Sequence, residues 1–126
     1  MKVELPLGDV VDKITILLIK EEQIKDSAKL ENIRSELATL RESWTEAGHP
    51  ALDSLADWTA LREVNQALWN VEDDLRDLER DGEFGPRFVE LARSVYKIND
   101  RRAALKRSIN LALGSRLVEE KSYAAY

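Results

Sequence analysis

Apolar side chains recur every three or four residues along three long stretches of the chain, which is the spacing of a helix with one buried face. The stretches cover residues 27–47, 57–80 and 86–114. Their apolar positions are, in order, Leu30, Ile33, Leu37, Leu40 and Trp44; Leu61, Val64, Leu68, Val71, Leu75 and Leu78; and Phe88, Leu91, Val95, Ile98, Leu105 and Ile109. The unbroken alternation predicts three amphipathic helices, and its heptad-like spacing favours shallow crossing angles between them.

A fourth helix is expected from Asp9 to about Lys25, but its pattern differs from that of the others. Val10, Val11, Ile14, Leu17 and Leu18 form one apolar face, whereas Ile16 and Ile19 point elsewhere. A helix that is apolar on two sides lies either at the centre of a fold or in a subunit interface. The sequence alone leaves both alternatives open.

Glycine, proline and capping residues separate these stretches. Asp26 or Ser27 can cap the second helix, and Gly48-His49-Pro50 ends it. A turn is expected at Leu52–Leu55, and Pro86 suits the first turn of the last helix, which Gly114 should terminate. No stretch alternates with period two for long enough to form a sheet, although Val3-Glu4-Leu5 could form a short extended arm. We therefore expect one all-α domain over residues 1–126, a bundle of four long antiparallel helices with short connections.

Composition and charge narrow the functional classes. The net charge is −5, but residues 53–83 carry 10 acidic and 3 basic side chains, whereas residues 84–116 carry 2 and 8. The simplest interpretation is that the two helices pack antiparallel and neutralise each other, and the overall acidity argues against nucleic-acid binding. The N-terminal residues lack the apolar run of a signal peptide, and the apolar run Ile16–Ile19 is too short to span a bilayer. We expect a cytoplasmic protein that does not enter the membrane.

Arg102 is the most informative residue, because it occupies an apolar position of the last stripe, between Ile98 and Leu105. A guanidinium remains protonated, so in a packed core it requires carboxylates, water or a bound anion. Antiparallel packing should place Arg102 at the level of Asn65–Trp69, and polar side chains lie nearby on the same and neighbouring helices. The candidate ligand-binding residues are Arg102, Lys106, Asn99, Asn110, Tyr96 and Lys13, and the candidate acidic partners are Glu72 and Asp12.

Two functions are compatible with this set of residues. In the first, an acidic side chain neutralises Arg102, the polar network fixes the helix register, and the protein is a non-catalytic interaction or assembly module. Trp58, Trp69 and the tail Leu117–Tyr123 are then the expected contacts with a protein partner, and a homodimer is expected. In the second, the cations line a site between the helices for a phosphate or carboxylate, in an anion-binding protein or a small enzyme.

Other chemistry is sparse. The chain has no cysteine and a single histidine, His49, so thiolate catalysis is excluded and a Ser/His/Asp set would require His49. No metal-ligand spacing or glycine-rich phosphate loop occurs, so we expect neither a metal nor a cofactor. Glu119 and Glu120, near the end of the chain, are expected to be exposed to solvent. Catalytic residues cannot be assigned from the sequence.

Three long blocks stand out in this sequence: residues 7–17 (LGDVVDKITIL), 65–73 (NQALWNVED) and 91–102 (LARSVYKINDRR), the last continuing through Lys106–Asn110 to Glu119–Tyr123. Together they resemble a bacterial family known as domain of unknown function 6165. The resemblance extends over nearly the whole chain, and its blocks contain the polar groups selected above on physical grounds. It implies no reaction, ligand or partner.

Overall fold

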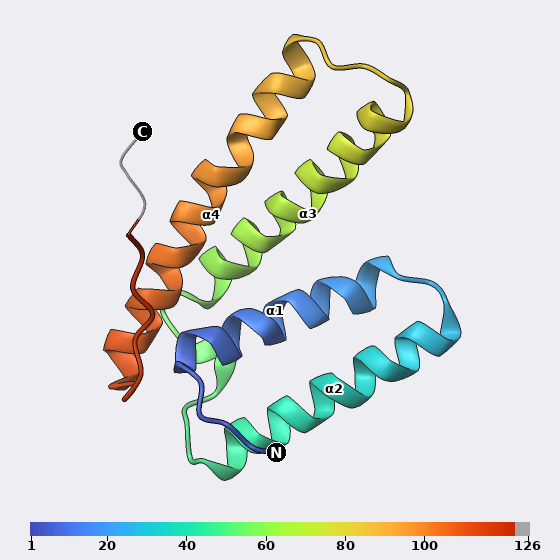
Figure 1. Ribbon diagram of the computed structural model, residues 1–126. Coiled ribbons are helices and arrows are strands. Elements are labelled where there is room, and N and C mark those ends of the chain that lie inside the picture. Colours follow the sequence, from blue (N-terminus) through green and yellow to red (C-terminus); the bar gives the residue numbers. More distant parts are fainter. Residues whose placement is uncertain (123–126) are drawn as a thin grey trace.

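The chain folds into four long helices arranged as two antiparallel hairpins (Figure 1). A computed structural model describes residues 1–122. The first hairpin consists of α1 (Leu7–Gln23) and α2 (Ser27–Glu46), and the second of α3 (Trp58–Arg80) and α4 (Pro86–Leu113). A short 3₁₀ helix, Leu52–Ser54, lies in the connection between them. Residues 1–122 contain no β-strand, which confirms the all-α prediction, and residues 1–6 adopt no regular secondary structure.

The helix ends follow the capping chemistry that the sequence predicted. Asp26 caps α2, since its Oδ1 atom accepts a hydrogen bond from the main-chain N–H of Lys29 at 3.0 Å. Pro86 is the first residue of α4, where its missing N–H has no consequence. Gly114 closes α4 in the left-handed region with φ of 64°, a conformation that favours glycine.

Helix α1 lies at the centre of the fold. It contacts α2, α3 and α4, whereas α2 packs mainly against α1. Its apolar side chains on both sides are buried, including Val11, Ile14, Leu17 and Ile19. The two apolar faces of α1 are therefore explained within a single chain, without a subunit interface.

Two clusters of buried side chains form the core. Val11, Trp44, Leu61 and Ile109 bring all four helices together where the hairpins meet. Ile14, Leu17, Ile33 and Leu37 join α1 to α2 further along. Trp58 is partly buried and packs against both clusters.

The far half of the second hairpin, residues 70–97, extends beyond this core and is termed the distal hairpin below. The two hairpins diverge from their meeting point, so the turn of each lies far from that of the other (Figure 1). Leu78 is the one buried residue between positions 66 and 108. Helices α3 and α4 pack antiparallel, but within residues 1–122 only the Arg87–Asp74 pair, at 3.8 Å, joins their charges. The expected mutual neutralisation of these two helices is therefore largely missing.

Candidate functional site

Arg102 forms a bidentate ion pair with Asp12 where α4 crosses α1. Arg102 Nε donates to Asp12 Oδ1 at 2.9 Å, and Nη2 donates to Oδ2 at 2.5 Å. Asp12 is 4% exposed, and the Arg102 side chain is 28% exposed. Parallel N–H···O bonds of this kind are the strongest charge-assisted geometry available to arginine. The inward position of Arg102, inferred from the apolar stripe, is thus accompanied by a carboxylate that compensates it.

Polar side chains from α1 and α3 complete the surroundings of Asp12. Asn65 donates through Nδ2 to Asp12 Oδ1 at 2.9 Å and to Thr15 Oγ1 at 2.8 Å. Thr15 in turn donates to the main-chain oxygen of Asp12 at 2.6 Å. All three residues are buried. Three helices are therefore tied to one carboxylate, so a shift of any helix along its axis would break several of these bonds.

A second ion-pair cluster lies one helical turn further along α4. Lys106 Nζ is 3.0 Å from Asp9 Oδ1 and 3.1 Å from Glu119 Oε2, and its side chain is 15% exposed. The tail that carries Glu119 folds back alongside α4 (Figure 1). Together with Asp12, Asn65, Thr15 and Arg102, these residues are termed the junction network.

Side chains from the end of α4 also cap the beginning of α1. The first N–H groups of a helix have no partner within the helix. Here the N–H of Gly8 donates to Asn110 Oδ1 at 2.6 Å, and the N–H of Leu7 donates to Ser115 Oγ at 3.1 Å. Gly8 is required at this crossing, because a Cβ atom there would overlap the main-chain oxygen of Lys106. The first and last helices are thus in backbone contact.

The ionisation of these groups reflects their pairing. The hydrogen bonds with Asp12 raise the pKa of Arg102 despite its burial. Burial lowers the pKa of Lys106, but the carboxylates of Asp9 and Glu119, at 3.0 and 3.1 Å from Nζ, outweigh that effect and leave the pKa raised. The hydrogen bond from Lys106 lowers the pKa of Glu119. All three groups are therefore charged at neutral pH.

Beside the junction network, a groove of about 380 Å³ opens between α1, α3 and α4. Its apolar walls are formed by Ile16, Ile19, Leu68 and Trp69. Asn65, Asn99 and Arg102 also line it, together with four charged residues: Lys20, Glu72, Asp73 and Arg76. The size is within the range of roughly 300–1,000 Å³ that is common for small-molecule sites.

The structure separates the candidate residues that the sequence grouped together. Arg102 and Asn99 are neighbours, with a 3.4 Å hydrogen bond from Arg102 Nη1 to Asn99 Oδ1, and both line the groove. Asn110 instead caps α1, and Lys106 is enclosed by its two carboxylates. Of the two candidate acids, Asp12 is the partner of Arg102.

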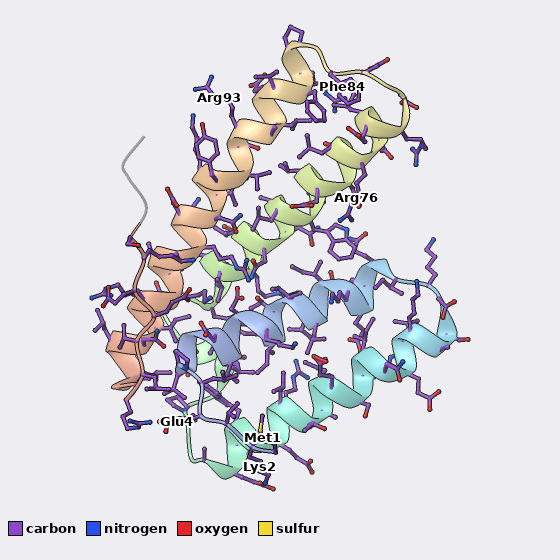
Figure 2. The ribbon with its side chains drawn as sticks, viewed as in Figure 1. Met1, Lys2, Glu4, Arg76, Phe84 and Arg93 are labelled. Atoms are coloured by element: carbon purple, nitrogen blue, oxygen red, sulfur yellow. The ribbon has the colours of Figure 1, made fainter. Side chains whose placement is uncertain are left out.

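Three other candidates lie elsewhere. Lys13 directly follows Asp12 and therefore points about 100° away from it around α1, where it pairs with Glu36 of α2 at 3.1 Å. Glu72 lines the groove, but its ion pair is with Arg76 of its own helix, at 3.8 Å. Tyr96 is 41% exposed and lies beside Arg93, whose pKa is raised by their hydrogen bond. Figure 2 shows Arg93 projecting from α4 on the side away from α3.

The sequence prediction omitted part of the junction network. Asn65 was named only as part of the stretch expected opposite Arg102, and not as a site residue. Glu119 was expected to be exposed, whereas it is half-buried against Lys106. Asp9 was not among the candidate acidic partners. One signal could have identified Asp9: Asp9 and Asp12 lie one turn apart on α1, as Arg102 and Lys106 do on α4. Two acids spaced like two bases predict a double ion pair between the helices.

The residues expected to contact a protein partner differ in accessibility. Trp58 is partly buried against the core, and the guanidinium of Arg62 lies 6.0 Å from the centre of its ring. Trp69 lines the groove. The tail is held to the body of the protein by Lys106–Glu119 and Arg107–Glu120 pairs, and Tyr123 lies outside the described residues.

The chain matches the family described as "Family of unknown function (DUF6165)" over residues 1–126. It belongs to this family. The match confirms the resemblance seen in the sequence blocks, and DUF6165 carries no activity that could be transferred to this chain. Comparisons with curated proteins and with solved structures gave no match.

Two further observations concern membrane-spanning helices and groups of metal-binding side chains in this chain. None of the helices in the described part of the chain is both long and apolar enough to cross a membrane. Within residues 1–122, no group of three or more His, Asp or Glu side chains lies close enough to hold a metal ion.

Proposed function

We propose that this DUF6165 protein is a non-catalytic, cytoplasmic assembly module that forms a homodimer through its distal hairpin. The junction network fixes the angle between the two hairpins, and the distal hairpin is the part left free to pair. The observation that supports this proposal most directly is that both inward cations are compensated within the chain, by Asp12 for Arg102 and by Asp9 and Glu119 for Lys106. Such pairing fits a structural role.

The same contacts disfavour the alternative of an anion-binding site at Arg102 and Lys106. Within residues 1–122, two cations face three carboxylates, and Lys121, 3.3 Å from Glu119, adds a third positive charge. A phosphate or carboxylate entering there would meet no excess of positive charge. It would also have to displace a carboxylate that is already hydrogen-bonded.

The distal hairpin has the properties of an unfinished helical bundle. Two helices alone cannot enclose their apolar stripes, and Leu75, Phe88, Leu91 and Val95 remain partly exposed. Phe84 lies at the turn between α3 and α4, as Figure 2 shows. It is 54% exposed and packs edge-on against Phe88. A second hairpin would complete a four-helix arrangement.

Charge complementarity favours a second copy of the chain as the occupant. Helix α3 is acidic and α4 is basic, yet one ion pair links them in residues 1–122. In an antiparallel pair of hairpins, each α3 can also lie next to the α4 of the other copy, where opposite charges attract. The pairing is self-complementary, as a two-fold dimer requires.

Sedimentation velocity tests the proposal. The wild-type protein should sediment as a dimer, at twice the chain mass of 14.4 kDa. Val89→Glu, at a site that is 51% exposed on the distal hairpin, should weaken the dimer by at least about tenfold, because a buried interface would then hold an unpaired charge.

Leu111→Glu is the matched control. Leu111 is also an exposed apolar residue of α4, at 63%, but it lies at the other end of the helix. This variant should dimerise like the wild type. A wild-type monomer at all soluble concentrations would refute the proposal, and so would equal effects of the two substitutions.

A further inference from the structure

The tail, residues 115–122, is held to the body of the protein mainly by side chains. It has no regular secondary structure, and within residues 1–122 the main-chain N–H groups of residues 116–120 donate to no other part of the protein. Leu117 and Val118 are only half-buried. A segment with few buried apolar side chains and few main-chain hydrogen bonds can open while the rest of the fold stays intact.

Two adjacent acids of the tail pair with two adjacent bases of α4. Glu119 Oε2 is 3.1 Å from Lys106 Nζ, and Glu120 Oε1 accepts a hydrogen bond from Arg107 Nη1 at 2.6 Å. The tail returns alongside α4 to make these contacts (Figure 1). The side chains of Arg107 and Glu120 are 46% and 72% exposed, so water and salt compete with that pair. The tail is therefore attached through specific charges, but weakly.

Opening of the tail would leave a positive surface where α4 crosses α1. Without the tail, three cations of α4 face two carboxylates of α1, which gives this group a net charge of +1: Arg102, Lys106, Arg107, Asp9 and Asp12. Such a surface attracts an acidic segment, and the tail supplies one from the same chain. Because it is covalently attached, the tail competes at an effective concentration on the order of millimolar.

We infer that this end of α4 is a docking site for an acidic segment of a partner protein, and that the tail occupies it as an autoinhibitory segment. The partner segment carries two adjacent acidic side chains, as Glu119 and Glu120 do in the tail. It binds when the tail opens and pairs with Lys106 and Arg107. The site lies outside the distal hairpin, so it does not depend on dimerisation.

A fluorescein-labelled peptide with the sequence of residues 116–122 (RLVEEKS) is the probe, observed by fluorescence anisotropy. The double variant Glu119→Gln, Glu120→Gln loosens the tail of the full chain. It should bind the peptide about fivefold more tightly than the wild type does, because each lost surface pair changes the competition by a factor of a few. The double variant Glu31→Gln, Glu42→Gln removes two exposed acids from α2 and changes the net charge equally, so it should bind like the wild type.

Two comparisons locate the site. In the variant with the loosened tail, Arg107→Gln should weaken peptide binding, whereas Arg41→Gln, at an exposed position of α2, should not. A peptide with glutamine in place of both glutamates should bind about fivefold more weakly than the acidic peptide. The two peptides can also be compared on the wild type, so this result does not require a variant.

Three outcomes would overturn the inference. Equal binding of the acidic peptide by the wild type and the loosened variant would show that the tail covers no docking site. Equal binding of the acidic and glutamine peptides would show that the acidic side chains are not recognised. A tetranucleotide that binds the loosened variant more tightly than the acidic peptide would identify a nucleic-acid surface instead.

Discussion

The junction and the distal hairpin are built from similar amphipathic helices but differ in how they are held. At the junction, four helices share a core, and buried polar groups are bonded to specific partners from other helices. In the distal hairpin, α3 and α4 have only each other, and most apolar side chains are partly exposed. Apolar periodicity therefore defines helices in both regions, whereas position along the helix axis is specified only where polar side chains must meet.

Removing Asp12 should have the largest effect on the free energy of unfolding, because it breaks the polar contacts that distinguish the junction from the distal hairpin. Asp12→Ala leaves Arg102 half-buried without its carboxylate, and we expect a loss of about 3 kcal/mol in the free energy of unfolding. Urea denaturation measures the change. The double variant Asp12→Ala, Arg102→Met should recover much of the loss, because no buried charge remains. If both variants were equally destabilised, the pairing would not be the cause.

Truncation of one leucine in each region compares their packing. Leu61 is fully buried at the junction, so Leu61→Ala should cost about 3 kcal/mol. Leu75 is partly exposed in the distal hairpin of a single chain, so Leu75→Ala should cost only about 1 kcal/mol at protein concentrations too low for dimers. Denaturation at low concentration gives both values. Equal losses would mean that the distal hairpin is packed as tightly as the core.

The close crossing of α1 and α4 is tested by glycine substitutions. Gly8→Ala places a Cβ atom against the main-chain oxygen of Lys106, and the helices must separate, at a cost of about 1–3 kcal/mol. Gly85→Ala is the control, since nothing lies within 4 Å of its added Cβ and its φ is −78°. The melting temperature should therefore be lowered by the first substitution and nearly unchanged by the second.

The smallest expected effect concerns the tail. Because the pKa of Glu119 is lowered in the folded protein, its ion pair stabilises the fold above the ordinary glutamate pKa of about 4.3. That contribution is lost as the pH falls through the lowered value. The side chain is 37% exposed, so the contribution is at most about 0.5 kcal/mol. Glu119→Gln should remove this part of the acid dependence of unfolding, and Glu120→Gln, at a more exposed site, should change it less.

Local signals in the sequence predicted much of the fold. The limits of α2 and α4 follow from Asp26, Pro86 and Gly114, each of which acts on its own helix end. The divergence of the two hairpins could not be predicted, because it depends on contacts such as Gly8 against Lys106, which are 98 positions apart in the sequence. Periodicity describes one helix at a time and contains no information on the angle to the next.

The candidate site was predictable to a similar extent. The inward position of Arg102 follows from the apolar stripe, and Asp12 could be named as one of two acids. The choice between Asp12 and Glu72 could not be made, because both can reach inward from their helices and only the packing of α1 against α4 decides. Glu119 could not be found, since it lies in a segment without periodicity and its partner Lys106 depends on how that segment folds back.

Asp12 and Arg102 are 90 positions apart in the sequence, which also bears on the order of events during translation. When α1 leaves the ribosome, Arg102 has not been synthesised, so the Asp12 carboxylate lacks its partner. The N–H groups of Leu7 and Gly8 likewise lack their acceptors, Ser115 and Asn110. The nascent chain can form local helices early, and α1 can pack against α2 and α3, but its contacts with α4 form only after α4 is synthesised. Completion of the core is therefore tied to the last part of synthesis, and a ribosome stalled before position 102 would hold a chain with its organising acid exposed.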